Sequence, residues 1–136
     1  MKTDIKHLAA YAATAIWADG VYDEAEKIVL EEIADAFELD EATLKTEVEA
    51  ALAEIEPKSE EEIDEYLRAH SAEVEEEEAE CVYLAAQQIV LADGILSADE
   101  VSNLLAIAST LGMDDERAIL LLADMVKEEP ELEVEL

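Results

Sequence analysis

A nine-residue segment at positions 18–26 occurs a second time at positions 92–100, and this repetition constrains the fold more than any other feature of the chain. In both copies an apolar run ends in Ala-Asp-Gly, and a glutamate follows six residues after the glycine. Asp93 is the counterpart of Asp19, and apolar residues continue to match at the same offset well beyond the motif, as Leu104 matches Leu30. The sequence therefore predicts two copies of one supersecondary unit.

Apolar residues at helical spacing predict three helices in the first repeat. The first spans about 4–18 with Thr3 as its N-cap, the second begins at Asp23, and the third follows Asp40 and ends before Pro57. The residues expected to face the core are Ile5, Leu8, Ala9, Ala12 and Ile16, then Val29, Ile33, Ala36 and Phe37, then Leu44, Val48, Ala51, Leu52 and Ile55.

The second repeat opens with a helix that ends at Ala92 and is apolar on nearly all sides over 79–91. A helix of this kind is normally buried, so we expect it to run through the middle of the bundle. Ser97 is predicted to cap the next helix, and Gly112 to end it. The core-facing residues expected there are Leu104, Ile107, Ala108 and Leu111. Asp114 is predicted to cap a last helix, which does not continue into the tail beyond Pro130.

An acidic segment at 57–73 joins the repeats and contains a short helix capped by Ser59. We interpret this segment as a solvated connector. The fold class that follows is all-α: one domain over 1–136, a bundle of about seven helices. It contains a first repeat at about 4–56 and a second at about 74–128, related by a pseudo-two-fold axis.

The net charge of −30, from 38 acidic and eight basic residues, limits the possible partners. Nucleic-acid binding is excluded because its affinity comes mainly from Lys and Arg on phosphates, and an anionic membrane surface is excluded for the same reason. No apolar stretch is long enough to span a bilayer, and the N-terminal residues do not resemble a signal peptide. A cytoplasmic protein is expected, with cations or basic proteins as its partners, or with charge that only keeps it soluble.

Asp19 and Asp93 each stand at the C-terminal end of a predicted helix. The helix macrodipole is negative there and disfavours a carboxylate by some tenths of a kcal/mol. Two interpretations remain open. Either both aspartates are used for binding, or Asp-Gly simply makes a good turn in which the side chain bonds to nearby backbone N–H groups.

Glu26 and Glu100 each stand three residues after a capping residue, Asp23 in the first copy and Ser97 in the second. A capping box accounts for this spacing. The tight turn also places each glutamate near the aspartate of its own copy. The four carboxylates, with Asp23 as a further candidate, could then converge or form two acidic pockets, and oxygen ligands of this kind suit Ca²⁺, Mg²⁺ or Mn²⁺.

An EF-hand is excluded, although the Asp-Gly and the later glutamate match the second half of its loop. With Gly20 at the loop glycine, the first and third ligand positions fall on Ala15 and Trp17, which cannot bind calcium. In the second copy the same positions fall on Ile89 and Leu91.

The paired Ala-Asp-Gly segments, each ending in a glutamate and lying between apolar helices, resemble the TerB family of tellurite-resistance proteins. Relatives of that family include the N-terminal part of the DjlA co-chaperones. The resemblance covers about 5–127 and implies a helical bundle with internal pseudosymmetry, acidic residues that bind divalent cations, and a bacterial stress response. The matching positions are Asp19, Gly20, Glu26, Asp93, Gly94 and Glu100. The repeats differ where Ser97 replaces Asp23, so two sites need not have equal affinity.

Other candidate residues have ordinary structural interpretations. His7 and Cys81 occupy equivalent repeat positions, and we expect a packed imidazole and a small buried thiol there in preference to a mixed metal site. Trp17 is expected in the core, and no partner is evident for His70.

No nucleophile elbow, phosphate-binding loop or Ser/His/Asp arrangement is present in the sequence, so neither an enzyme nor an organic cofactor is expected. The leading hypothesis is a helical module that binds divalent cations in a stress response. The alternative is an interaction scaffold whose acidic surface docks a basic or membrane-associated protein. A metal-dependent hydrolase built on the four carboxylates is the weakest hypothesis.

Overall fold

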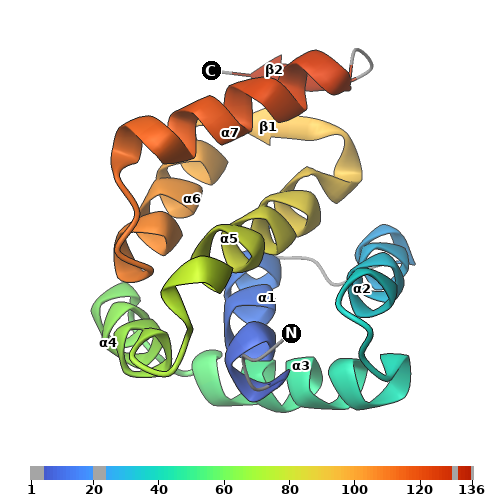
Figure 1. Cartoon of the computed structure of the whole chain (residues 1–136), viewed down its shortest axis with the longest axis vertical. Helices are drawn as coiled ribbons and strands as arrows, with labels where there is room; N and C mark the ends of the chain where they lie inside the picture. Colours follow the sequence, from blue (N-terminus) through green and yellow to red (C-terminus); the bar gives the residue numbers. More distant parts are fainter. Residues whose placement is uncertain (1–4, 20–23, 130–131, 136) are drawn as a thin grey trace.

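The computed structural model describes residues 5–19, 24–129 and 132–135, and within these ranges it contains seven α-helices (Figure 1). The helices are α1 (Ile5–Asp19), α2 (Glu24–Ala36), α3 (Glu41–Ile55), α4 (Glu60–Ser71), α5 (Glu76–Val90), α6 (Ala98–Thr110) and α7 (Asp115–Glu128). A 3₁₀ turn, η1 (Leu91–Asp93), follows α5, and β1 (Ile95–Ser97) and β2 (Glu133–Glu135) are short strands. The predicted all-α class with about seven helices is confirmed. No described helix is both long and apolar enough to cross a membrane.

The helix boundaries follow the repeat. At the offset that relates Asp93 to Asp19, both ends of α6 match the ends of α2, and the start of α7 matches the start of α3. The packing of the two units differs, however. α3 packs closely along α1, whereas α7 packs mainly on α6 and touches α5 near its own start. There, the Tyr83 hydroxyl donates to the Ala118 carbonyl at 3.0 Å, and Arg117 Nη2 pairs with Glu80 Oε1 at 2.7 Å. The pseudo-two-fold axis stays a prediction.

Side-chain caps begin the helices largely where the sequence places them. The amide of Thr43 donates to Asp40 Oδ2 at 3.0 Å, and Ser59 with Glu62 forms a complete capping box. Asp114 occupies the N-cap of α7, but its side chain makes no capping hydrogen bond. The predicted caps at Thr3 and Asp23 lie outside the described residues.

α2 and α6 end in the same way, at equivalent positions. Gly112 has φ of +76° and Glu38 has φ of +57°, both in the left-handed region. The next residue in each case donates its amide back across the turn, Met113 to Ala108 at 3.0 Å and Leu39 to Ala34 at 2.8 Å. These are the hydrogen bonds of a Schellman motif, in which glycine is the preferred residue.

Replacing Glu38 by glycine is expected to stabilise the protein by about 1 kcal/mol, because a left-handed conformation strains a residue with a Cβ. Urea unfolding followed by circular dichroism measures the change. Glu38→Ala is the matched control, since it removes the charge at the end of α2 but keeps the strain. Equal stability of the glycine and alanine variants would contradict the explanation.

α1 is buried on nearly all sides and forms the centre of the bundle, in contact with α3, α4, α5 and α6 (Figure 1). The sequence predicted one apolar stripe on this helix, and that prediction was too narrow. The buried residues are Leu8, Ala9, Ala10, Tyr11, Ala12, Ala13, Thr14, Ala15 and Ile16. Small alanine side chains let several helices approach one backbone closely, and no polar face is needed where solvent does not reach.

The other core-facing predictions hold for most positions. α5 is largely buried, as predicted, although Cys81 and Gln88 are exposed. In α3 the predicted residues are buried except Leu52, which is partly exposed. The prediction for α2 was wrong in part, because Leu30 and Ala34 are buried beside Ile33, whereas Ala36 is exposed.

The acidic connector is more than a solvated link. Ile63 and Leu67 of α4 are buried against α1 and α6, whereas Glu61, Glu62 and Glu65 of the same helix are exposed. The Tyr11 hydroxyl donates to the Leu67 carbonyl at 3.2 Å and shares a hydrogen bond of 2.8 Å with Thr110. Burial raises the pKa of Tyr11 to about 12, so the hydroxyl stays protonated and able to donate. α4 is therefore a packed part of the bundle.

A small parallel sheet, absent from the sequence prediction, joins β1 to β2. Leu96 pairs with Val134, and the Glu133 amide donates to the Gly94 carbonyl at 2.8 Å. β1 coincides with the extended residues that precede the Ser97 cap, and the tail supplies alternating acidic and apolar residues. The sheet holds the C-terminal residues against the second Ala-Asp-Gly turn.

Candidate functional site

The structure describes the backbone at the four predicted site residues. Asp19 ends α1, Glu26 lies in the first turn of α2, Asp93 ends η1, and Glu100 lies in the first turn of α6. The side chains of Asp19, Glu26 and Asp93 lie outside the described part of the structure, as does all of Asp23. The geometry of the predicted site is therefore described for one side chain, that of Glu100, and for the packing of the helices that carry the other residues.

Glu100 is a capping residue and is nearly buried, at 9% exposure. Its Oε1 accepts from the Ser97 hydroxyl at 3.0 Å and from the Ser97 amide at 3.3 Å, and its own amide donates to Ser97 Oγ at 3.2 Å. The capping-box interpretation is thus confirmed for the second copy. Glu100 holds the segment that follows the Asp-Gly turn in a defined conformation.

Gly94 completes the second turn with φ of +80°, and its amide donates to the Leu91 carbonyl at 3.0 Å. The positive φ is why a residue without a Cβ stands there. α5 ends at Val90, η1 ends at Asp93 immediately before this glycine, and the chain then continues into β1. The expected role of this glycine as a helix stop is confirmed, and the turn sets the position of the Asp93 backbone.

The tertiary packing places the second copy of the motif against the helix that follows the first copy. η1, which carries Asp93, lies in contact with α2, the helix that follows the first Ala-Asp-Gly. α2 also contacts α5. The sequence left open whether the two acidic turns meet. At the level of the backbone, the second turn packs against the helix that leads out of the first.

A hollow of about 570 Å³ lies beside this contact, between α2, the end of α5 with η1, and the end of α7. α7 touches α5 near the start of α7, and the last turn of α7 borders this open space. The lining residues are Val29, Glu32, Gln88, Leu91, Ala92, Gly94, Met125, Glu128, Glu129 and Leu132. In Figure 1, α2 lies to the right of the end of α5, and the end of α7 lies above both.

Three glutamates of this hollow were missed by the sequence reasoning: Glu32, Glu128 and Glu129. All three are exposed and bring carboxylates from α2 and from the end of α7 to the rim beside the Asp93 turn. Nothing in their spacing distinguishes them from the many acidic residues on solvated helix faces. Among the described residues, no three His, Cys, Asp or Glu side chains lie close enough together to hold a metal ion.

A buried polar side chain lies one helical turn before η1. Gln87 of α5 is completely buried, and within the described part of the chain neither its Oε1 nor its Nε2 has a hydrogen-bond partner. A buried amide of this kind normally finds a partner, since leaving it unpaired costs about 1–3 kcal/mol. In the sequence, Gln87 stands out only as a polar residue on an apolar helix.

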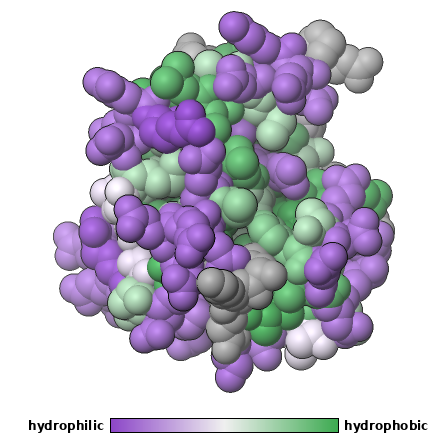
Figure 2. Space-filling view, viewed as in Figure 1, coloured by the Kyte–Doolittle hydropathy of each residue, from purple (hydrophilic) through white to green (hydrophobic). Residues whose placement is uncertain are grey.

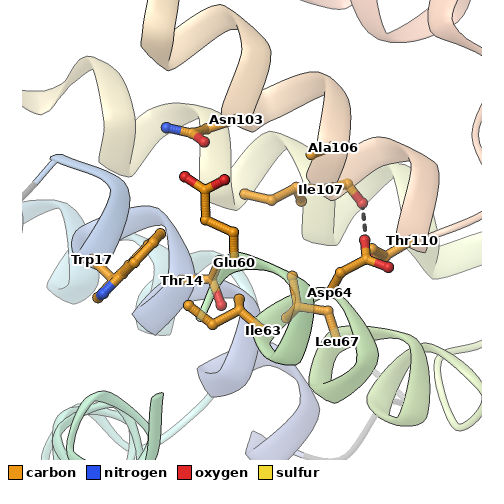
Figure 3. Close-up of a pocket in the computed structure, with 10 residues that line it drawn as sticks. All are labelled: Thr14, Trp17, Glu60, Ile63, Asp64, Leu67, Asn103, Ala106, Ile107 and Thr110. Atoms are coloured by element: carbon orange, nitrogen blue, oxygen red, sulfur yellow. Dashed lines mark hydrogen bonds between the residues drawn. The ribbon is translucent and has the colours of Figure 1, made fainter. Parts of the chain in front are cut away.

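A second, smaller cavity of about 120 Å³ lies between α1, α4 and α6 (Figure 3). Apolar side chains including Ile63, Leu67 and Ile107 line it, and Trp17 forms one wall. The Glu60 carboxylate points across the opening towards Asn103. Trp17 is therefore partly buried at the edge of the core, close to its predicted place. Thr14 and Thr110 bring hydroxyl groups to this cavity and Glu60 and Asp64 bring carboxylates, while the rest of its described lining is mainly apolar.

The environments predicted for His7 and Cys81 were wrong in part. Cys81 is exposed, beside Ala36 at the end of α2 and Phe37 in the turn that follows. His7 is half-buried and lies against His70, with the two Nδ1 atoms 2.7 Å apart. The equivalent repeat positions differ because His7 faces α4, which has no counterpart following the second repeat.

The acidic residues dominate the surface around these cavities. In Figure 2, hydrophilic residues cover most of the face drawn, and apolar residues show across its middle. The described ion pairs are at the surface: Lys45 bridges Glu31 and Glu41, and Arg68 pairs with Asp64 in addition to the Arg117 pair. Exposed pairs contribute little to stability, typically below about 1 kcal/mol. Most of the 38 acidic side chains therefore have no counterpart among the eight basic residues of the sequence.

Comparison with known proteins gives one match. Residues 6–123 match the family model described as tellurite resistance protein TerB. No curated protein and no solved structure matches the chain. The matched segment includes both Ala-Asp-Gly sequences, helices on either side of them and the connector. Because it covers most of the 136 residues, the chain belongs to the TerB family.

Proposed function

We propose that this TerB-family domain binds divalent cations at the acidic turns, in a response to tellurite or a related stress. The observation that carries the proposal is the contact between η1 and α2, which brings the Asp93 turn against the helix that follows Asp19. Asp19, Asp93 and Glu26 are the proposed ligands, with Asp23 as a further candidate. Glu100 acts mainly by holding the second turn through its capping box.

Two features support cation binding at this place. The rim of the neighbouring hollow adds the carboxylates of Glu32, Glu128 and Glu129, which favour a cation near the turns even where they do not coordinate it. Carboxylate and carbonyl oxygens, with no thiolate or imidazole among the described residues that line the hollow, suit a hard ion such as Ca²⁺, Mg²⁺ or Mn²⁺. An aspartate at the negative end of a helix also becomes favourable once a cation is bound.

Removing the two aspartates is expected to weaken binding of Ca²⁺, Mg²⁺ or Mn²⁺ by about tenfold or more, because each supplies a charged ligand. Isothermal titration of each ion at physiological salt compares the wild type with Asp19→Asn/Asp93→Asn. The matched control is Glu49→Gln/Glu65→Gln, which removes two exposed carboxylates from α3 and α4. It should leave the affinity nearly unchanged. Millimolar or weaker binding that is the same in all three proteins would overturn the proposal.

A second candidate function is docking of a basic or membrane-associated protein. It is favoured by Ile119 and Leu120 on α7, which are 49% and 58% exposed, with acidic residues before and after them on the helix. A partner bound through this surface would be released by high salt, which screens charges, and would be insensitive to a chelator. A partner released by chelator alone would instead favour the cation site.

A further inference from the structure

The cavity of about 120 Å³ between α1, α4 and α6 is lined by none of the four residues of the predicted cation site. Its lining includes the buried side chains of Ile63, Leu67 and Ile107. Trp17, the only tryptophan of the sequence, forms one wall, and the Glu60 carboxylate lies at the opening (Figure 3). An apolar interior with a carboxylate at its mouth suits a group that has an apolar stem and a cationic end.

The polar groups at this cavity are mainly hydrogen-bond acceptors. Thr14 donates its hydroxyl proton to the Ala10 carbonyl at 2.9 Å, and Thr110 donates its own to the Ile107 carbonyl at 2.7 Å. What these hydroxyls can still offer to a ligand is an acceptor lone pair, and the Glu60 carboxylate only accepts. A ligand that matches this lining must therefore donate.

The mouth of the cavity is negatively charged. The Glu60 carboxylate points across the opening towards Asn103 of α6, and none of the ion pairs in the described part of the chain includes Glu60. Asp64, one turn further along α4, pairs with Arg68 Nε through its Oδ2 at 2.7 Å, and its Oδ1 takes no part in that pair. The described lining residues include no basic side chain. In a chain of net charge −30, this mouth attracts a cation.

We propose that this cavity binds the side chain of a lysine presented by a basic protein, an inference that deepens the docking function proposed above and rests on it. The four-carbon stem of the lysine lies among the buried apolar side chains. Its ammonium group lies beside Glu60 of α4 and the amide oxygen of Asn103 of α6. Arginine is less suitable, because its planar guanidinium matches the two oxygens of one carboxylate, whereas three diverging ammonium donors match acceptors on two helices.

The size of the cavity favours one side chain over a larger ligand. Drug-sized molecules occupy pockets of about 300–1,000 Å³, whereas a cavity of about 150 Å³ in another protein holds benzene. A volume of about 120 Å³ accommodates the few heavy atoms of a lysine side chain. Side chains that fill pockets of this kind anchor protein interfaces.

The test titrates a short peptide, with one lysine flanked by glycine and serine, into the protein at physiological salt with a chelator present. Trp17 fluorescence reports binding, because this tryptophan lines the cavity. A saturable change that fits one site per chain is expected. A norleucine in place of the lysine keeps the apolar stem and lacks the ammonium group, so it should weaken binding by about tenfold or more. An arginine in its place should also weaken binding.

Variants of the protein locate the site. Glu60→Gln should weaken binding of the lysine peptide by about tenfold, because it removes the charged acceptor. Glu61→Gln is the matched control, since it removes the same charge from the next residue of α4, which is exposed and does not line the cavity. Ala106→Leu fills the cavity from an exposed position on α6 and should abolish binding. Circular dichroism shows whether each variant is folded.

Two further variants separate this proposal from those made above. Asp19→Asn/Asp93→Asn and Leu120→Ala should bind the lysine peptide as the wild type does. Loss of the cation site or of the α7 surface would then leave the lysine pocket intact, and failure of the pocket would leave those two proposals standing.

The simpler explanation of the cavity is a packing gap that holds only water. A gap of this kind gives no saturable fluorescence change, equal binding of the lysine and norleucine peptides, or equal affinity in Glu60→Gln and Glu61→Gln. Any of these results would overturn the proposal, as would equal binding of the arginine peptide. Binding of free pentylammonium without binding of the peptide would indicate a small-molecule site and would overturn the assignment to a protein partner.

Discussion

Replacing Leu104 by alanine is expected to lower the free energy of unfolding by about 3–5 kcal/mol. Leu104 lies in α6 and is completely buried in the hydrophobic core. Truncation removes apolar contacts and leaves a cavity that closely packed helices fill only in part. A loss of this size is a large fraction of the roughly 5–15 kcal/mol by which a domain is normally stable.

Urea unfolding followed by far-ultraviolet circular dichroism and by Trp17 fluorescence measures the Leu104→Ala effect. Leu120→Ala is the matched control, because it makes the same chemical change on a side chain that is 58% exposed. The control should change stability by less than about 0.5 kcal/mol. Similar losses in the two variants would show that α6 does not pack in the core as described.

Replacing Tyr11 by alanine is expected to lower the free energy of unfolding by about 3–5 kcal/mol as well, for a different reason. The Tyr11 ring is completely buried in the central helix α1, and its hydroxyl contacts two other helices. It donates to the Leu67 carbonyl of α4 and bonds with Thr110 of α6. The substitution therefore removes core volume and the polar link among three helices.

Tyr11→Phe separates these two contributions. It keeps the ring and deletes only the hydroxyl, so about 1–3 kcal/mol should be lost from the hydrogen bonds it leaves unpaired. Thr110 keeps its bond to the Ile107 carbonyl at 2.7 Å, which limits the loss on that side. Denaturant unfolding of all three proteins measures both steps. A phenylalanine variant as unstable as the alanine variant, or an alanine variant that loses less than about 1 kcal/mol, would contradict this account of the core.

The helices themselves were predictable because their signals are local. Ser97 with Glu100, Ser59 with Glu62, and Asp40 each act on an amide within three residues, so a short stretch of sequence contains the whole interaction. Gly112 ends α6 through hydrogen bonds within the same turn. The constant offset between the two repeats then predicted that α6 would resemble α2, and the boundaries of the two helices agree.

Burial was harder to predict where a helix has small or apolar residues on all of its sides. The alanines of α1 look alike on every side, and only the number of helices packed around α1 decides that all of those at 9–15 are buried. Cys81 sits in a run as apolar as its neighbours, yet it faces outward on α5. Periodicity identifies an apolar face only when a polar face stands opposite it.

The sequence by itself determined the family, the seven helices and the caps at Asp40, Ser59 and Ser97, because these depend on residues close together in the chain. Only the tertiary structure decided that η1 lies against α2, that Glu32 meets the end of α7 at one hollow, and that His7 meets His70. These placements depend on how whole helices pack. Contacts between residues tens of positions apart leave no mark in local sequence, because each partner alone looks like an ordinary surface residue.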